Sequence, residues 1–217
     1  MEIHILDQTN SVINSYLAQM RSVAVQSDRP RFRHNIERIG HLMAYELSKT
    51  LNYKPAEVTT PLGVATVNLP QDQIVVGTIL RAGIPMHHGV LDVFDEAENC
   101  FVSAYRAYDD NHGVEIHLGY AATPRLDGKV LIIADPMLAT AKSMVQTLRQ
   151  LLKFGTPAHI HVMSIIGAQP GVDYLAQNPV AVPTTLWVAT VDKELNADSY
   201  ILPGLGDAGD LAYGTKE

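Results

Sequence analysis

Cysteine is nearly absent from this sequence, because Cys100 is the only one among 217 residues. A lone cysteine excludes an internal disulfide and fits a reducing compartment. Long apolar runs are missing as well, since no stretch approaches the ~20 apolar residues of a membrane span. The first residues, MEIHILDQTN, lack the charged start and the apolar core of a signal peptide. We therefore expect a soluble, cytoplasmic protein without a membrane partner.

Positive charge is also scarce. Lys and Arg together number 16, Asp and Glu number 23, and the net charge at pH 7 is −7. A general nucleic-acid-binding protein normally carries a basic patch, and none is visible, so we expect no nucleic-acid partner. An anionic substrate would have to be held by a few local cations and by backbone N–H groups.

The composition is otherwise that of a globular protein, with 47% apolar and 18% charged residues. A chain of 217 residues can bury a substantial core in one domain. We expect a single α/β domain over residues 1–217, without internal repeats or a long linker. Its parts are N-terminal helices at about 10–50, a core at about 70–192 and a C-terminal loop at 200–210.

Two helices and a hairpin are expected before the core. Apolar residues recur at helical spacing from Asn10 to Met20 and from Arg31 to Thr50. Glu57 to Leu69 alternates apolar and polar residues around a Pro–Gly turn, which indicates a hairpin. Four arginines cluster between the two helices and are interpreted as a solvated basic turn, namely Arg21, Arg29, Arg31 and Arg33.

The stretch Lys129 to Leu148 carries the strongest functional signal. Val130 to Ala134 predicts a buried strand of a parallel sheet, and Asp135 ends it. A small-residue turn follows, and a helix is expected from Ser143 to Leu152. Ligands of open α/β sheets bind at such strand ends, and the N–H groups of the turn form an anion site. An acid for hydroxyl groups beside a nest for phosphate fits a ribose 5-phosphate, although many α/β proteins share this order of elements.

A second strand, Ile74 to Leu80, runs into Arg81 and a helix from about Pro85. An arginine at a strand end can hold phosphate oxygens, or it can pair with a surface acid. A third strand, Cys100 to Tyr105, ends at Arg106, and Ala107 to Thr123 is expected to form a projecting hairpin arm. Two further strands and a short helix follow, at His159–Ile166, Thr185–Val191 and Val172–Gln177.

The histidines do not predict a metal site. His87 and His88 are neighbours on an expected helix and diverge by about 100°, so they do not easily share one ion. His159 and His161 fall on one face of a strand, but a pair without a third ligand is weak support for zinc. We assign no metal ligand from the sequence.

The tail from Tyr200 to Asp210 places apolar residues between glycines, which is unusual for a flexible end. Glycines let a backbone approach a flat ligand closely and present its own N–H and C=O groups. A pyrimidine edge needs such alternating donors and acceptors.

Four motifs, in their order along the chain, resemble those of uracil phosphoribosyltransferases. They are ILRAG at Ile79–Gly83, YR at Tyr105-Arg106, DPMLAT at Asp135–Thr140 with Ser143, and YILPGLGDAGD at Tyr200–Asp210. RFR at Arg31–Arg33 and the helix containing Tyr45-Glu46 also look like the family's N-terminal region, so the similarity covers nearly the whole chain from about Asn10. The resemblance implies the phosphoribosyltransferase fold: a mostly parallel sheet flanked by helices, a hood built from the chain ends, and a projecting β-arm.

The resemblance implies transfer of the 5-phosphoribosyl group from phosphoribosyl diphosphate (PRPP) to N1 of uracil, giving UMP and diphosphate in pyrimidine salvage. Arg81 and Arg106 would hold the diphosphate, and Asp207 would meet PRPP through Mg²⁺ or its water shell. Arg106 and Asp207 are the implied catalytic residues. The implied PRPP loop consists of Asp135, Pro136, Met137, Leu138, Ala139, Thr140, Ala141, Lys142 and Ser143, and the implied uracil contacts are Ile201, Gly206, Asp207 and Ala208.

The sequence departs from the family pattern in the PRPP loop, where Ala141 and Lys142 stand in place of two glycines. The alternative reading is therefore a weak or inactive regulator that senses PRPP or a pyrimidine nucleotide with the same fold. A transferase for another base is disfavoured by the tail. The resemblance also implies a homodimer or higher homo-oligomer and, in some members, activation by GTP at a site that no residue here identifies.

Overall fold

The structure is a computed structural model that describes residues 1–108 and 114–216, with side chains for all of these except 104–108 and 114–119. A central sheet runs in the strand order β1-β10-β9-β7-β4-β5-β6. Its strands are parallel except for β6, which is the antiparallel edge strand. The parallel strands are β1 (Glu2–Ile5), β4 (Ile74–Ile79), β5 (Glu98–Tyr108), β7 (Val130–Ala134), β9 (His159–Ala168) and β10 (Thr184–Asp192).

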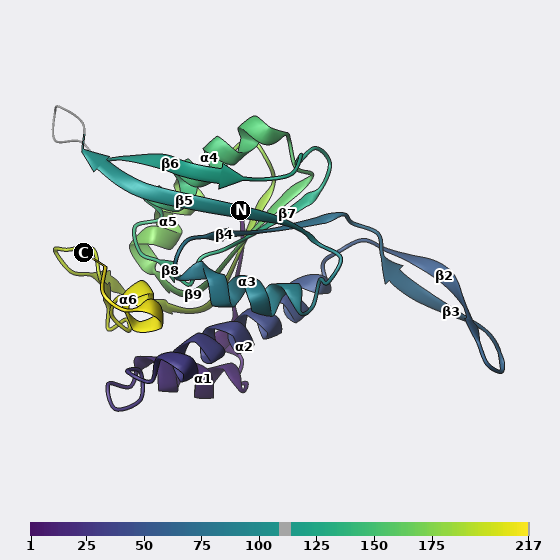
Figure 1. The fold of residues 1–217 in the computed structure, drawn as a ribbon, viewed down its shortest axis with the longest axis horizontal. Helices are drawn as coiled ribbons and strands as arrows, with labels where there is room; N and C mark the ends of the chain where they lie inside the picture. The colour runs from purple at the N-terminus through teal and green to yellow at the C-terminus, as the bar shows by residue number, and fades with distance from the viewer. Residues whose placement is uncertain (109–113, 217) are drawn as a thin grey trace.

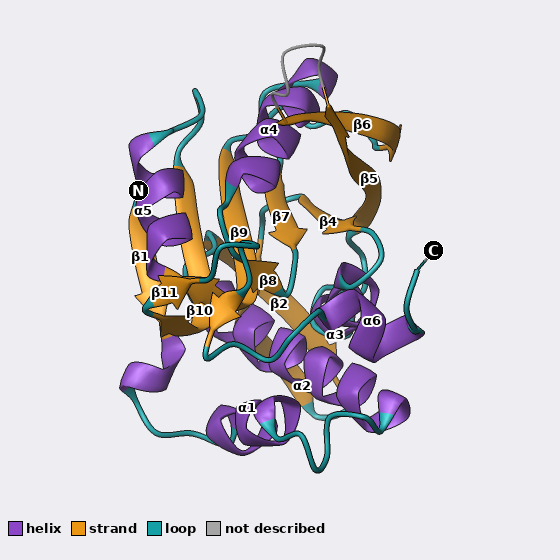
Figure 2. Ribbon diagram, turned by 90° about the vertical axis from the view of Figure 1, so that its left-hand side faces the viewer, coloured by secondary structure: helices purple, strands orange, loops and turns teal. Residues whose placement is uncertain are grey.

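The central strands are buried on both faces, which explains their continuous apolar sequences. In β7 every side chain lies inside, and successive residues alternate between the two faces of the sheet. Ile132 and Ala134 join the core beneath α2 (Arg29–Ser48) and α3 (Gly83–Leu91). Leu131 and Ile133 join the core beneath α4 (Lys142–Leu151) and α5 (Gln169–Gln177). Figure 2 shows these helices on the two sides of the sheet.

Two helices in the N-terminal part of the chain pack beside the C-terminal segment (Figure 1). They are α1 (Ile13–Arg21) and α2, and the segment ends in the short helix α6 (Ala208–Tyr213). Asp28 caps α2, because its carboxylate accepts from the Arg31 N–H at 3.1 Å. Helices α2 and α3 approach closely at Gly89, where a Cβ atom would lie 2.0 Å from the Glu37 carbonyl oxygen. Helix α2 also contacts α6, so the two ends of the chain pack together as expected for the hood.

Two hairpins leave the body of the molecule. The expected N-terminal hairpin is β2 (Tyr53–Thr60) and β3 (Gly63–Pro70), which pair only with each other and project away from the central sheet (Figure 1). The arm expected at Ala107–Thr123 consists of the end of β5 and β6 (Val114–Ala122), which continue the central sheet at its edge, while residues 109–113 lie outside the described part.

Several elements were not expected from the sequence. Strand β1 adds a parallel edge next to β10, and β8 (Met137–Leu138) pairs with β9 inside the expected turn. The tail contains β12 (Ile201–Leu202), which pairs with β11 (Glu194–Leu195), as well as α6. The described residues also contain two 3₁₀ turns, at Leu6–Gln8 and Leu152–Phe154. In the described residues no helix is long and apolar enough to cross a membrane.

Candidate functional site

The candidate site lies at the carboxyl ends of neighbouring parallel strands. Strands β4 and β7 are adjacent, and Arg81 and Asp135 follow them directly. The two strand ends touch, since the Thr78 hydroxyl lies 3.5 Å from the Ala134 carbonyl oxygen. Gly83 is required beside them, because a Cβ atom there would lie 2.2 Å from the Thr78 Oγ1. Arg81 and Asp135 are 54 positions apart in the sequence. The pairing of β4 with β7 brings the two loops that they begin close together.

Asp135 is held in a fixed position after β7. Its N–H donates to the Met163 carbonyl at 3.0 Å, and its own carbonyl accepts from the Ser164 hydroxyl at 2.7 Å. Among the described residues the carboxylate makes one long contact, 3.4 Å from the Met137 N–H. Burial of this carboxyl group raises its pKa to about 7, and the Met137 N–H partly opposes the shift. A poorly paired acid at a strand end can accept hydrogen bonds from sugar hydroxyl groups.

The loop after Asp135 is supported from behind. The Pro136 carbonyl accepts from the N–H groups of Ile165 and Ile166, which anchors the start of the loop on β9. Helix α5 lies against the next residues, because a Cβ atom on Gly171 would lie 2.1 Å from the Ala139 carbonyl oxygen. The backbone of this loop is therefore fixed by contacts with β9 and α5.

The turn that begins α4 adopts a left-handed conformation at Ala141, with φ 56° and ψ 0°. This conformation is unfavourable for a residue that carries a Cβ atom. Lys142 and Ser143 are the first two residues of the helix. Lys142 is exposed and Ser143 is half-buried. The first N–H groups of a helix have no partner within the helix, so this turn could hold an anion, with the positive charge of Lys142 beside it.

Arg81 faces the C-terminal segment. Its Nη2 lies 3.3 Å from Asp210 Oδ1, and its Nη1 lies 3.4 Å from the Gly214 carbonyl oxygen. Both side chains of the ion pair are partly exposed. Arg106, the second expected diphosphate residue, lies in β5 opposite Ile116, and its side chain is outside the described part.

The predicted base-binding residues lie in the segment between β12 and α6. Ile201 is buried in β12, and Gly206 has φ +95°, a conformation that requires glycine. Asp207 caps α6, because its Oδ1 accepts from the Asp210 N–H at 2.9 Å. Ala208 is buried as the first residue of that helix. Asp207 is exposed.

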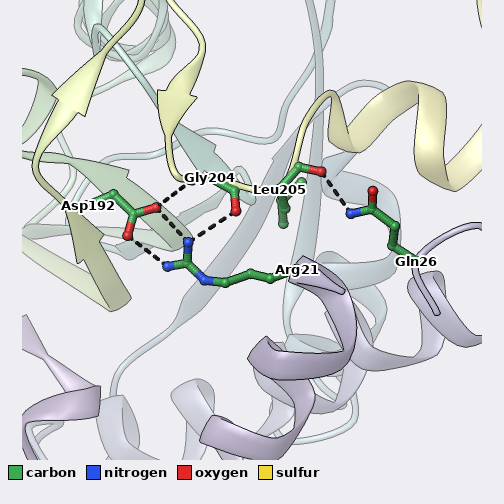
Figure 3. A network of polar contacts seen from close by, with 5 residues as sticks. All are labelled: Arg21, Gln26, Asp192, Gly204 and Leu205. Atoms are coloured by element: carbon green, nitrogen blue, oxygen red, sulfur yellow. Dashed lines mark hydrogen bonds and ion pairs between the residues drawn. The ribbon is translucent and has the colours of Figure 1, made fainter. Parts of the chain in front are cut away.

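The interpretation of the N-terminal arginines as a solvated turn is wrong for two of them. Arg21 makes a two-point ion pair with Asp192 at 2.7 and 2.8 Å and donates to the Gly204 carbonyl at 3.1 Å (Figure 3). Arg33 donates to the Ala212 carbonyl at 2.7 Å. Both therefore fasten the C-terminal segment, which a local count of charges does not reveal.

Three of the histidines considered above contact other side chains or are buried. The Trp187 indole N–H donates to His161 Nδ1 at 3.1 Å, and burial beside His159 lowers the pKa of His161 to about 3. His159 meets the Thr185 hydroxyl at 2.9 Å. His87 is buried in α3, and burial lowers its pKa. No group of three or more His, Cys, Asp or Glu among the described residues could hold a metal ion.

Sequence reasoning missed several residues that shape this region. Asp192, Gln26 and Asp210 contact the C-terminal segment or Arg81, and Gly171 supports the loop after Asp135. The signals were faint: an acid that ends a strand, and a glycine in the first turn of a helix. Neither pattern names its partner, because the partners are distant along the chain.

The family model described as uracil phosphoribosyltransferase matches residues 8–215 of this chain. A curated uracil phosphoribosyltransferase of Porphyromonas gingivalis is 52% identical over 216 residues, covering 100% of both chains. One of Methanothermobacter thermautotrophicus is 40% identical, covering 99% of this chain and 96% of its own. A solved structure of a protein from Aquifex aeolicus is 30% identical with a TM-score of 0.85, covering 98% of both chains.

Proposed function

This chain belongs to the uracil phosphoribosyltransferase family, and from that premise we propose that it transfers the 5-phosphoribosyl group of PRPP to N1 of uracil. The products are UMP and diphosphate, and the reaction serves pyrimidine salvage. The observation that carries the proposal is the full-length identity of 52% with an enzyme of that name. The arrangement of Arg81, Asp135 and the segment after Ile201 supports it, because phosphate, ribose and base would each meet suitable groups there.

The loop from Asp135 to Ser143 would hold the ribose 5-phosphate. In this proposal the Asp135 carboxylate accepts hydrogen bonds from the ribose hydroxyl groups. It can do so because its contact with the Met137 N–H is long and weak. The N–H groups at the start of α4 and the hydroxyls of Thr140 and Ser143 bind the 5-phosphate, and exposed Lys142 adds a charge. The remaining loop members, Pro136 to Ala139 and Ala141, would contribute backbone groups.

Arg81 and Arg106 would neutralise the diphosphate. Negative charge develops on the leaving diphosphate while the anomeric carbon becomes cationic, so arginines aimed at the diphosphate stabilise the transition state. Mg²⁺ fits this site as an ion held mainly by substrate oxygens, since it keeps several waters and prefers few carboxylates. Asp207, which is exposed, would hold it through water. When bound, the ion supplies charge neutralisation at the diphosphate.

Uracil would be read by backbone groups between Ile201 and Ala208. Positioning the flat base beside the anomeric carbon supplies a large part of the rate enhancement. Cytosine exchanges an acceptor for a donor at one edge position and leaves a buried partner unpaired, which costs about 1–3 kcal/mol. The described parts of β5 and β6 are proposed to cover the site and exclude water.

The test incubates the protein with PRPP, Mg²⁺ and each of uracil, cytosine, hypoxanthine and orotate, and separates the nucleotides formed. We expect UMP from uracil and no product from cytosine. Preference for another base would contradict the assignment of the C-terminal segment. No nucleotide with any base, together with PRPP binding by calorimetry, would favour the sensing regulator, which the comparisons do not support.

We also propose a homo-oligomer, because the β2–β3 hairpin exposes apolar side chains in isolation from the core. Leu62 at its turn is fully exposed, and Val58, Val64 and Val67 are exposed along its strands. Light scattering of the purified chain measures the mass, and a monomer at micromolar concentration would contradict this proposal. Adding GTP to the same activity assay tests the effector role, which we propose without a binding site.

A further inference from the structure

The base-binding segment is fastened by two residues outside it, Arg21 at the end of α1 and Asp192 at the end of β10. The guanidinium of Arg21 donates to both carboxylate oxygens of Asp192, at 2.7 and 2.8 Å. The Asp192 side chain is only 9% exposed and that of Arg21 is 25% exposed. A two-point arginine–carboxylate pair fixes direction as well as distance, and a buried carboxylate depends on its partner.

Both members of this pair also bind the backbone of Gly204. Arg21 Nη1 donates to the Gly204 carbonyl at 3.1 Å, and Asp192 Oδ2 accepts from the Gly204 N–H at 2.9 Å. Gly204 has φ +55°, and a Cβ atom there would lie 2.2 Å from the Ile201 carbonyl oxygen. The turn after Ile201 therefore has one allowed residue type, and its two peptide polar groups are both occupied by the ion pair (Figure 3).

A second contact fastens the next residue. The Gln26 side-chain amide donates from Nε2 to the Leu205 carbonyl at 3.0 Å and to the Met20 carbonyl at 2.9 Å. Gln26 lies in the connection between α1 and α2. Consecutive residues Gly204 and Leu205 are thus held from the N-terminal helices and from the central sheet, just before the backbone that reads the base.

We infer that Arg21, Asp192 and Gln26 are positioning residues for the pyrimidine, which set the backbone of Gly204–Leu205 and so the direction of the donors and acceptors from Gly206 to Ala208. This inference rests on the proposed function. A misplacement of a binding backbone by a fraction of an ångström weakens every hydrogen bond that it makes with a flat base. The proposed contacts of the 5-phosphate, the ribose and Arg81 lie on other loops, and Asp207 would meet PRPP only through the water shell of Mg²⁺. PRPP binding should therefore depend less on this network than uracil binding does.

The test measures KM for uracil and for PRPP, with calorimetric PRPP binding in the absence of base. Gln26→Glu keeps size but replaces the donor at two carbonyl groups by an acceptor. Arg21→Met and Asp192→Asn each break the two-point pair, and Arg21→Lys keeps the charge without the fork. Arg31→Met is the matched control, since Arg31 pairs with Asp28 at the start of α2.

We expect KM for uracil to rise at least fivefold in Gln26→Glu and Arg21→Met, with KM and Kd for PRPP within twofold of wild type. Arg21→Lys should lie between wild type and Arg21→Met, and Arg31→Met should match wild type. Equal losses in uracil and PRPP binding, or an unchanged KM for uracil in Gln26→Glu, would overturn the inference. If Arg21→Met fails to fold, Gln26→Glu and Arg21→Lys still decide. A wild-type protein that makes no UMP overturns the proposed function itself, which is a separate result.

Discussion

Arg81 and Asp210 form an ion pair that joins the loop after β4 to helix α6, with Nη2 and Oδ1 3.3 Å apart. The side chains are 41% and 34% exposed, so the pair is screened and contributes little to stability. A diphosphate group carries more charge than one carboxylate and can replace it as the partner of Arg81. The pair thus holds Arg81 beside the C-terminal segment, in a position where an anion could take the place of Asp210.

Replacing Arg81 by alanine should weaken PRPP handling far more than uracil binding. A charge-assisted hydrogen bond contributes about 1.5–3 kcal/mol, so KM for PRPP should rise roughly tenfold or more. Arg125→Ala is the control, because Arg125 is exposed and lies 3.9 Å from Asp127 on the surface. Steady-state kinetics with each substrate varied in turn measure the effect, and an unchanged KM for PRPP would contradict the role of Arg81.

Asp135 should make PRPP binding depend on pH. Its folded-state pKa is raised to about 7, and only the ionised carboxylate is a full acceptor for ribose hydroxyls. Affinity for PRPP should therefore rise as the pH increases from 6 towards 8. PRPP phosphates titrate in the same range, so the measure is the difference between wild type and Asp135→Asn in calorimetric titrations. Parallel pH profiles of the two proteins would count against Asp135.

The same pKa has a consequence for stability without any ligand. The folded-state pKa lies above 3.8, the ordinary value of an aspartate side chain, so the folded protein binds more protons than the unfolded chain between about pH 4 and 7. Stability from this group is present at acid pH and is lost as the pH rises through about 7. Relative to Asp135→Asn, wild type should lose free energy of unfolding between pH 4.5 and 7.5 in urea titrations. A constant difference would contradict the raised pKa.

Local sequence order was enough to predict the strand and the helix on either side of the loop after Asp135. The strand before Asp135 was predicted with its observed bounds, Val130–Ala134, because an apolar run between turn residues is a short-range signal. The helix after the loop was expected from Ser143 and begins one residue earlier. The possible strain at Ala141 was also visible, since glycine is the usual residue in a left-handed turn.

The fastening of the C-terminal segment could not be predicted in the same way. Arg21 and Asp192 are separated by 171 positions, and no local pattern pairs one arginine with one of many acids. Strand β1 has four residues, and its first two are exposed, so its sequence carries almost no periodicity. Both features depend on tertiary contacts that outweigh local preference.

Gly171→Ala should disturb the loop after Asp135 from behind. The added Cβ atom would lie 2.1 Å from the Ala139 carbonyl oxygen, a backbone atom that cannot move away alone. We expect a loss of about 1–3 kcal/mol in unfolding free energy and weaker PRPP binding. Gly63→Ala is the matched control, because a Cβ atom there meets nothing within 4 Å. Equal stability of the two variants would show that helix α5 does not support the loop.

The last prediction concerns Ala141, where φ is 56°. A left-handed residue with a Cβ atom costs on the order of 1 kcal/mol, and glycine removes that cost. Ala141→Gly should strengthen PRPP binding roughly fivefold, because the N–H groups of the turn keep their direction at lower cost. Ala139→Gly is the control in the same loop, where φ is not positive and glycine should destabilise by about 0.4–1 kcal/mol through the entropy of the unfolded chain. That entropic cost applies at both positions, so the expected result is that Ala141→Gly is more stable than Ala139→Gly by about 1 kcal/mol in urea titrations and binds PRPP more tightly in calorimetric titrations. If Ala141→Gly destabilises as Ala139→Gly does, the left-handed turn carries no strain, and the alanine in this loop costs the protein nothing in binding its substrate.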